Sequence, residues 1–343
     1  MASVDYHRNL ADAQGDAALA AALGPDVQRT PFDRLGWWRA LAEECLADEV
    51  PLLAVAREGE ATCALPLIRR RGSGQLRSLA NWYSFRARPV FANCGERLLP
   101  ATARDLAKHA RRISLAPMDE RDAASTAAAF RAAGWTARAE QIDVNHKLEL
   151  RGRDFATYWA ARPGRVRETV RRKRAKGAVS LRIREDFSEP DWGAYEAVYA
   201  RSWKPREGST AFLRRFAQTE AAGGRLRLGL ATIGGEPAAA QLWTVENGVA
   251  YIHKLAHDER FKAHSPGTLL SHAMFADAID RDRVHTIDFG TGDDPYKRDW
   301  MEIAAPLLRL DMHRPRDPRS WPHLLRDRLK GPGFPLAAVQ HGR

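Results

Sequence analysis

This sequence has few cysteines and no long apolar run, and each absence excludes a class of protein. The three cysteines, Cys45, Cys63 and Cys94, form neither a CxxC pair nor a metal-ligand spacing. We therefore expect reduced thiols and a cytoplasmic protein. No stretch approaches the roughly 20 consecutive apolar residues that span a bilayer, and residues 1–15 lack the apolar core of a secretory signal. The eleven histidines include no HExxH motif, and we expect no metal cofactor.

The chain is long enough and apolar enough to build a real core. Its 343 residues suit two domains of ordinary size or one large domain. Hydrophobic residues make up 44% of the sequence, and ten residues are tryptophan. We expect several of these tryptophans to lie in pockets or between domains.

Positive charge is concentrated in two segments. The net charge is +11, of which Arg162–Lys176 carries +7 and Arg314–Arg343 carries +5, which leaves −1 for the rest. This distribution predicts localised contacts with anions. For Arg162–Lys176 a solvated helix face, tRNA, an anionic membrane and a phosphorylated lipid all stay open. The tail segment Trp321–Leu329 mixes leucines with arginines and fits either a membrane surface or docking on the body.

Hydrophobic periodicity predicts alternating helices and strands, which fits an α+β fold. The elements predicted in the second half are the helices Arg162–Lys176, Trp192–Trp203, Ala211–Ala221 and Pro266–Asp280, and the strands Val179–Ile183, Arg225–Ala231, Ala238–Val245, Val249–Leu255 and His285–Phe289. A similar helix-then-hairpin order begins at Phe32–Ala47, followed by the strands Leu52–Ala56 and Cys63–Ile68. Met1–Arg29 has no clear pattern, and we expect it to be loose at its start.

The run Phe261–Leu270 predicts an anion-binding helix start. A proline at the first helical position, Pro266, wastes no hydrogen bond. Gly267, Thr268 and Leu269 then point backbone N–H groups outward at the positive end of the helix dipole. Gly267 has no side chain, so a bulky anion could approach the backbone closely. This is the geometry of a phosphate cradle, although an ordinary helix start has the same local sequence.

Motifs that follow the cradle resemble the GNAT superfamily. After the helix come Ile287-Asp288-Phe289 and the run Tyr296-Lys297-Arg298-Asp299-Trp300. The order of these motifs is a strand, the cradle helix, the Ile-Asp-Phe strand and then Tyr-Lys-x-x-Trp. This order resembles the GNAT branch that is related to the FemAB peptidyltransferases and to acetyltransferases of exopolysaccharide and cellulose gene clusters. The resemblance in motifs covers about Ala175–Asp311. Over Phe32–Leu150 only the order of the predicted helices and strands is similar. The usual Gly-x-Gly/Ala of the family is replaced by Ser-Pro-Gly-Thr.

The resemblance implies a tandem GNAT-like fold with mixed, mostly antiparallel sheets flanked by helices. We expect a degenerate GNAT-like domain over residues 1–150, a donor-binding GNAT-like domain over 151–313 and a basic tail over 314–343. It also implies acetyl-CoA or another acyl-CoA as the co-substrate. The residues expected to bind this donor are Leu255, Ala256 and His257 along the pantetheine, and Ser265, Gly267, Thr268 and Leu269 at the pyrophosphate.

Four residues are candidates for the chemistry of acyl transfer. By resemblance Lys297 faces the reacting acyl group, where its charge would stabilise an oxyanion. Tyr296 could protonate the thiolate leaving group, but packing against Trp300 explains it equally well. Asp288 is a candidate base or a partner of Lys297, and His253 is the better base at neutral pH. Around the acceptor we expect Trp203 and Lys204 from the second half and Trp82 and Tyr83 from the first.

The sequence thus predicts a cytoplasmic acyl-CoA-dependent N- or O-acyltransferase, peripheral at the inner face of the membrane. Its acceptor would be a small molecule or a glycan- or lipid-linked group of the cell envelope. Two alternatives remain. One is a FemAB-type transferase that uses aminoacyl-tRNA, and the other is a non-catalytic nucleic-acid-binding protein that uses the two basic segments.

Overall fold

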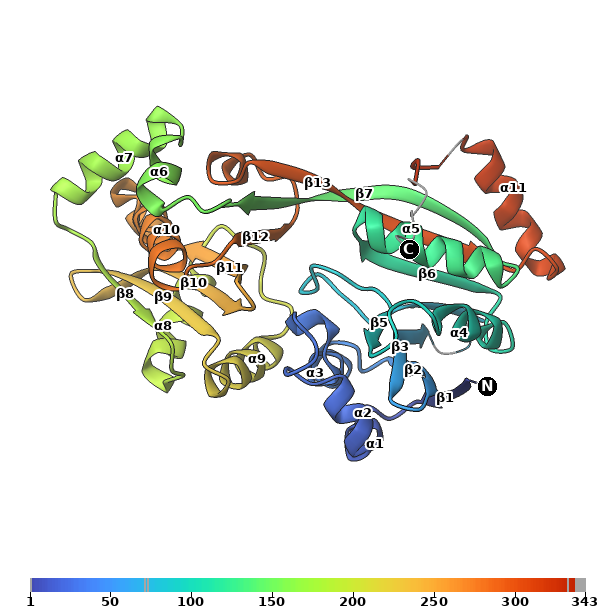
Figure 1. Cartoon of the computed structure of the whole chain (residues 1–343). Coiled ribbons are helices and arrows are strands. Elements are labelled where there is room, and N and C mark those ends of the chain that lie inside the picture. Colours follow the sequence, from blue (N-terminus) through green and yellow to red (C-terminus); the bar gives the residue numbers. More distant parts are fainter. Residues whose placement is uncertain (1, 71, 73, 332, 337–343) are drawn as a thin grey trace. The chain divides into compact units, whose positions relative to one another are not determined.

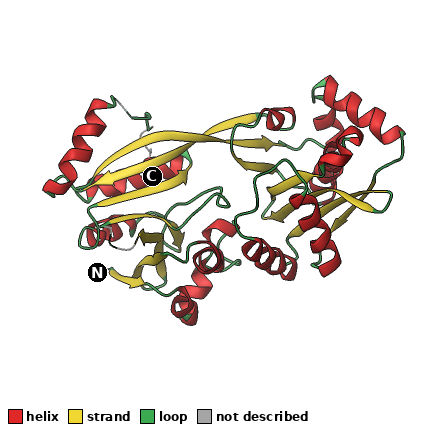
Figure 2. Cartoon of the chain, turned by 180° about the vertical axis from the view of Figure 1, so that it is seen from behind, coloured by secondary structure: helices red, strands yellow, loops and turns green. Residues whose placement is uncertain are grey.

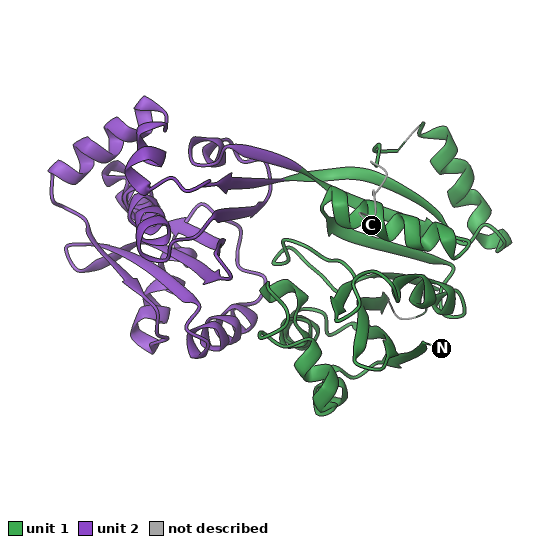
Figure 3. Cartoon of the chain, in the orientation of Figure 1, with its two compact units in different colours: residues 1–144, 306–343 green, residues 145–305 purple. Residues whose placement is uncertain are grey.

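The chain divides into two compact units (Figure 3). The computed structural model describes residues 2–70, 72, 74–331 and 333–336. The first unit is Met1–Val144 with Pro306–Arg343, and the second is Asn145–Ala305. Residues 332 and 337–343 of the predicted basic tail lie outside the described residues. Within the part that is described, no helix is both long enough and apolar enough to cross a bilayer.

The first unit is a mixed sheet covered by helices (Figures 1 and 2). Its strands lie in the order β1-β2-β3-β4-β6-β13, with β5 on β3. They are β1 (Ser3–His7), β2 (Glu49–Glu58), β3 (Ala61–Arg70), β4 (Gln75–Ser78), β5 (Val90–Ala92), β6 (Arg112–Met118) and β13 (Ile303–His313). The helices are α1 (Leu10–Gly15), α2 (Ala17–Ala22), α3 (Leu35–Cys45), α4 (Leu99–Leu106), α5 (Glu120–Ala132) and α11 (Trp321–Leu329).

A large apolar cluster lies in the first unit. Leu65 and Leu67 of β3 and Leu308 and Leu310 of β13 pack with Phe130 of α5, and all five side chains are buried. Cys63 lies in the same cluster, and burial raises the pKa of its thiol to about 12, so it stays protonated. All three cysteines are free thiols.

The expectation of a loose N-terminus is wrong. β1 pairs antiparallel with β2, from Ser3 opposite Arg57 to His7 opposite Leu53. The carboxylate of Asp16 then accepts a hydrogen bond from the backbone N–H of Leu19 and caps α2. The missing signal is long-range, because the strand is stabilised by pairing with a partner about fifty residues away and has little apolar alternation of its own.

The second unit is a sheet with helices on both faces. The strand order is β7-β12-β11-β10-β9-β8. The strands are β7 (Thr136–Glu149), β8 (Ser180–Arg184), β9 (Leu226–Ile233), β10 (Glu236–Glu246), β11 (Val249–His257) and β12 (Thr286–Thr291). The helices are α6 (Phe155–Ala160), α7 (Gly164–Ala175), α8 (Glu189–Ala200), α9 (Thr210–Ala222) and α10 (Pro266–Ala276). This order confirms the α+β prediction.

Side-chain contacts assign the helices to opposite faces of that sheet. Gln241 and Trp243 of β10 reach the face of α10, where Gln241 bonds the Ser271 hydroxyl and Trp243 packs on Phe275. His253 of β11 reaches the other face and packs on Phe216 of α9. The helix α10 lies along the sheet with α7 beside it (Figure 1). Its last turn widens into a π-helical turn over Asp277–Arg281, so it ends earlier than the predicted Asp280.

The parallel strands β11 and β12 part after a short pairing. They pair only from Val249 to Tyr251 on β11, opposite Thr286 to Asp288 on β12. Beyond that point β11 stays with β10 as far as His257, and β12 returns to β7 at Thr291. The register of β11 also shifts at His253, which is a β-bulge and turns the strand. The sheet therefore opens at this end.

Candidate active site

The helix α10 begins without a side-chain cap. Ser265 precedes it in a left-handed conformation with φ of 53°, and its side chain makes no capping hydrogen bond. The first helical hydrogen bond here runs from the Leu269 N–H to the Ser265 carbonyl. The N–H groups of Gly267 and Thr268 thus point out of the helix start, where the dipole favours an anion. Pro266 has no N–H to satisfy.

A cavity of about 570 Å³ opens at this helix start. Five of the seven predicted donor residues line it, and Tyr296 and Trp203 line it as well. The lining comprises Val166, Trp203, Leu255, His257, Lys262, Ser265, Pro266, Gly267, Thr268, Ser271, Phe289, Tyr296, Asp299 and Trp300. The side chains of Ala256 and Leu269 are buried beside it. Their backbone contacts to a donor stay a prediction.

The cradle side of the cavity has a neutral histidine. The ring of His257 lies 4.4 Å from that of Trp203, centroid to centroid. Burial lowers the pKa of His257, and the nearby Glu259 carboxylate offsets this only in part. A Cβ added to Gly267 would meet His257 at an ordinary contact distance of 3.6 Å, so the cradle has little spare room beyond one methyl group.

Tyr296 lies on the opposite side of the cavity, where the strands part. Its ring packs edge-on against Phe289 at 5.8 Å. Burial, with help from the Asp294 carboxylate and Tyr199, raises the pKa of the Tyr296 phenol above its ordinary value. The hydroxyl therefore remains protonated at neutral pH and can donate a proton or a hydrogen bond.

A second cavity of about 640 Å³ lies on the α8 and α9 side. Its wall combines aromatic rings with charges: Trp192, Tyr195, Glu196, Tyr199, Ala200, Lys204, Arg206, Glu207, Thr210 and Leu213. Trp203 lines the first cavity and the next residue, Lys204, lines the second, so one loop borders both. Lys254 Nζ lies 3.1 Å from Glu207 and over the Tyr199 ring. Burial lowers the pKa of Lys204, and Lys254 lowers it further.

Residues 160–298 match the family model of the acetyltransferase (GNAT) domain. We call this segment, residues 160–298, the GNAT domain. The match covers the cradle, the strands β11 and β12, the second cavity and all of the first cavity except Asp299 and Trp300, and it ends at Arg298. No curated protein matches the sequence.

Solved structures share the fold over more than the GNAT domain. The C-terminal DUF2156 domain of a putative lysylphosphatidylglycerol synthetase from Agrobacterium fabrum has a TM-score of 0.56 at 12% identity, over 93% of this chain and 96% of that one. FemX has a TM-score of 0.57 at 11% identity, and the alignment covers 80% of this chain and 90% of that one. A conserved protein of unknown function from Bacteroides thetaiotaomicron has a TM-score of 0.57 at 11% identity, and the alignment covers 91% of this chain and 100% of that one. The fold of FemX agrees with the FemAB-related resemblance.

Two of the predicted catalytic residues of the GNAT domain lie beneath the cavity wall. Lys297 is only 4% exposed, and its Nζ donates to the carbonyls of Thr291 at 2.5 Å and Gly290 at 3.4 Å. Asp288 is also buried, and it accepts from the Gly290 N–H at 2.9 Å and from Asn145 at 3.2 Å. Both therefore hold the end of β12, and neither is among the residues that line the cavity.

His253 lies on the face of the sheet opposite α10. Its Nε2 lies 2.8 Å from the Thr244 hydroxyl and its ring packs on Phe216. Burial lowers the pKa of His253 to about 3, with Lys254 contributing, so the imidazole is neutral at working pH. The role of His253 as a base stays a prediction.

Two predicted acceptor-side residues belong to the first unit. Trp82 is 64% exposed, whereas Tyr83 is buried and its backbone N–H bonds the Asn81 side chain. Their role toward the acceptor stays a prediction. Sequence reasoning missed the pairing of Glu207 with Lys254, because these residues are 47 apart and no local pattern joins them. Among the described residues no cluster of three His, Cys, Asp or Glu could hold a metal ion.

Proposed function

We propose that the protein is an acyl-CoA-dependent N- or O-acyltransferase whose donor occupies the first cavity. One observation carries the proposal: the cavity joins an uncapped helix start, which favours an anion, to the protonated phenol of Tyr296 at the opening between β11 and β12. An acyl-CoA has a diphosphate near one end and a thioester at the other, and such a cavity would need to bind both parts.

The donor would bind through backbone groups at the cradle and along β11. Gly267 and Thr268 offer N–H groups to the diphosphate, with Lys262 nearby at the same rim. Beyond Tyr251, β11 no longer pairs with β12, so the amides of a pantetheine arm could take the place of that missing strand. This leaves the acyl group beside Phe289 and Tyr296.

The transfer then needs two proton movements. An amine or hydroxyl of the acceptor attacks the thioester carbonyl, the carbon–sulfur bond breaks, and the acyl group passes to the acceptor. Tyr296 would give its proton to the departing thiolate. Glu207, which lines the second cavity, would take the proton of the attacking group. Asp288 and Lys297 would act as positioning residues, because they fix the strand end that bears Phe289 and leads to Tyr296.

The second cavity is the proposed acceptor site. Aromatic rings beside charged groups suit a polar acceptor that carries a glycan or a headgroup. The structural relative named as a lysylphosphatidylglycerol synthetase supports a lipid-linked acceptor of the cell envelope. We place the protein in the cytoplasm at the inner face of the membrane, with α7 and the basic tail as its membrane-facing segments.

An aminoacyl-tRNA donor is the second candidate. It is favoured by the basic helix α7, since Lys173 Nζ donates to the carbonyl of Ala263 in the loop that precedes the cradle. A tRNA backbone on α7 would therefore end close to the same cavity. Non-catalytic binding of nucleic acid by the basic segments is the remaining alternative.

Calorimetry separates these candidates. We expect acetyl-CoA or a longer acyl-CoA to bind the intact chain, and Gly267→Asp to weaken binding at least tenfold, because it adds bulk and negative charge at the cradle. The matched control is Gly193→Asp on the exposed side of α8, where an added Cβ meets nothing within 4 Å. If no acyl-CoA binds the wild type at millimolar concentration while aminoacyl-tRNA does, the second candidate replaces the first.

A further inference from the structure

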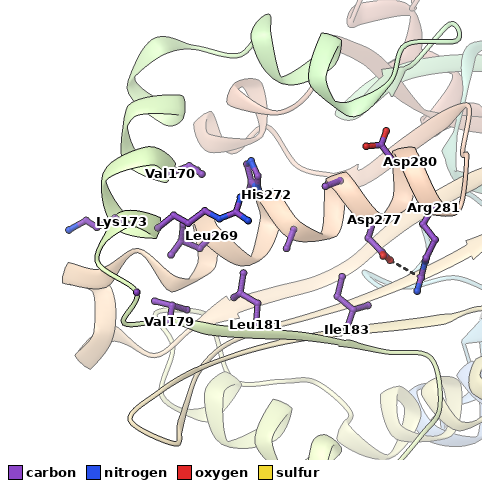
Figure 4. Close-up of a pocket in the computed structure, with 14 residues that line it drawn as sticks. Val170, Lys173, Val179, Leu181, Ile183, Leu269, His272, Asp277, Asp280 and Arg281 are labelled. Carbon is purple, nitrogen blue, oxygen red and sulfur yellow. Dashed lines mark ion pairs between the residues drawn. The ribbon is translucent and has the colours of Figure 1, made fainter.

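A third cavity lies along the flank of α10, away from the cradle (Figure 4). It measures about 610 Å³ and is formed by α7, the segment after it, the strand β8 and α10. The donor cavity uses Pro266, Gly267, Thr268 and Ser271 of α10. This groove uses Leu269, His272, Ala273 and Ala276, so the two cavities lie on different sides of one helix.

The walls of the groove are apolar and open. β8 is the last strand of its sheet. Leu181 and Ile183 of β8, and Val179 just before it, alternate in sequence and point toward α10 (Figure 4). The side of α10 that faces these residues leaves space for the groove, because the side chains of Ala273 and Ala276 are small. Leu181 consequently remains 41% exposed. A strand edge that leaves aliphatic side chains in water gains free energy when an apolar group covers them.

The charges at the two ends of the groove differ. At the end toward α7 lie Lys173 and Arg174, and no ion-pair partner of Arg174 occurs in the described part of the chain. At the other end the acids are already engaged. Asp277 pairs with Arg281 at 2.7 Å, and Asp280 accepts the backbone N–H of Phe155 at 2.9 Å. The available positive charge therefore lies at the α7 end, and the Asp280 carboxylate keeps its negative charge at the other end.

The middle of the groove is uncharged. Burial lowers the pKa of His272 to about 4, with Arg174 contributing, so its imidazole is neutral. Its ring packs edge-on against Phe155 and Trp159 of α6. From Leu269 to Ala276 the helix rises about 10 Å, which is roughly the length of an eight-carbon alkyl chain. The groove thus offers an apolar slot of that length with a cationic mouth.

We propose that this groove binds an anionic membrane phospholipid, with an acyl chain between β8 and α10 and the phosphate at Lys173 and Arg174. Two exposed cations beyond the groove, Arg172 of α7 and Lys176 just after it, would face the surrounding anionic headgroups. Nucleic acid would use these cations but not the aliphatic slot. The site is separate from the transfer site, so the proposal does not depend on the identity of the acyl donor.

The test uses soluble short-chain lipids on the full chain. Dihexanoylphosphatidylglycerol below its micelle concentration should bind, dihexanoylphosphatidylcholine should bind at least fivefold more weakly, and glycerol 3-phosphate should not bind measurably. These three probes separate headgroup, charge and chain. No binding of the phosphatidylglycerol, or equal binding of glycerol 3-phosphate, would overturn the proposal.

Two variants locate the site. Ala273→Phe fills the slot without changing charge and should weaken lipid binding about tenfold, while tRNA binding stays unchanged. Arg174→Gln should weaken it roughly fivefold, the effect of one cation near an anionic headgroup. Lys173 is left intact because it bonds the loop before the cradle. The charge-matched control is Arg121→Gln on α5, and the melting temperature of each variant reports folding. Unaltered lipid affinity in Ala273→Phe would refute the slot.

Discussion

Tyr296 carries the proton that the proposed transfer has to place on the leaving thiolate. Because burial raises the pKa of its phenol, the proton donor is fully present at neutral pH and is lost only at strongly alkaline pH. Tyr296→Phe keeps the ring against Phe289 and removes the proton. We expect turnover to fall by about 10²-fold or more, with donor affinity nearly unchanged, in a steady-state assay with acetyl-CoA. Tyr6→Phe, which removes a hydroxyl bonded to Asp105 in the first unit, is the control.

Lys297 tests whether a positioning residue matters to the chemistry. Lys297→Met keeps the length and removes the charge that bonds the carbonyls of Gly290 and Thr291. We expect turnover to fall by about 10²-fold and the free energy of unfolding to fall by about 1.5–3 kcal/mol, as for hydrogen bonds to a charged group. Asp288→Asn should also cost activity, and the double variant should be less than additive. A stability loss with unaltered turnover would confine Lys297 to a structural role.

His253 makes folding sensitive to acid. Its pKa is about 3 in the folded protein and about 6.5 when unfolded, so the unfolded state binds the proton more readily. This contribution to stability is complete above about pH 6.5 and is lost progressively as the pH falls toward 3. At pH 5 the loss should be about 2 kcal/mol. Urea unfolding at pH 7 and pH 5 measures it, and His253→Gln should reduce the difference by about 2 kcal/mol, while the part due to His272, whose pKa is lowered to about 4, stays. An equal difference in that variant would assign the effect to other groups.

At the scale of single elements, α11 presents an apolar stripe to solvent. Trp321, Leu325 and Leu329 recur every four residues and are 59%, 61% and 81% exposed. The polar side is turned inward, with His323 stacked on His313 and Asp327 beside it. Basic residues, Arg326 and Arg328, flank the stripe. This is the pattern of a helix that lies in a membrane surface.

The α11 prediction is tested with vesicles. Leu325→Ser with Leu329→Ser should lower co-sedimentation with phosphatidylglycerol vesicles by about tenfold or more, because two leucines lose their insertion. The melting temperature should stay within a degree, since neither side chain packs on the body. The control is Leu324→Ser, which is half-buried and lies off the exposed stripe. Equal sedimentation of the double variant would mean that the stripe meets something other than lipid.

Local signals predicted the elements that matter most to the donor cavity. The strand at Val249, the helix start at Pro266 and the strand at Ile287 follow from alternation, proline placement and helical spacing, all of which act within a few residues. The pairing of β1 with β2 and the return of β13 to β6 join segments far apart in the sequence, and no local pattern encodes them. The direction of the Lys297 side chain was equally unpredictable from local sequence. Its place in the Tyr-Lys-x-x-Trp motif did not reveal that its ammonium group donates to the carbonyls at the end of β12.

At the scale of the whole molecule, the two units have separate apolar clusters. The first contains Phe130 and Leu310, and the second contains Phe275 and Trp300. We expect two transitions in a calorimetric scan. Acyl-CoA at about 100 times its dissociation constant should stabilise only the unit that binds it, by about 2.7 kcal/mol. The upper or lower transition should therefore shift alone. One transition, or an equal shift of both, would show that the units unfold together.

One helix serves both the donor cavity and the lipid groove. The start of α10 binds the proposed diphosphate, while its flank, one turn further along, forms the proposed slot for the acyl chain. Any change in the position or rigidity of α10 on lipid binding must then appear as a change in donor affinity, and linkage requires the same factor in the reverse direction. The ratio of acyl-CoA dissociation constants with and without dihexanoylphosphatidylglycerol measures that factor. A ratio below one would mean that lipid strengthens donor binding, so arrival at a membrane, rather than donor concentration, would decide when the enzyme is charged.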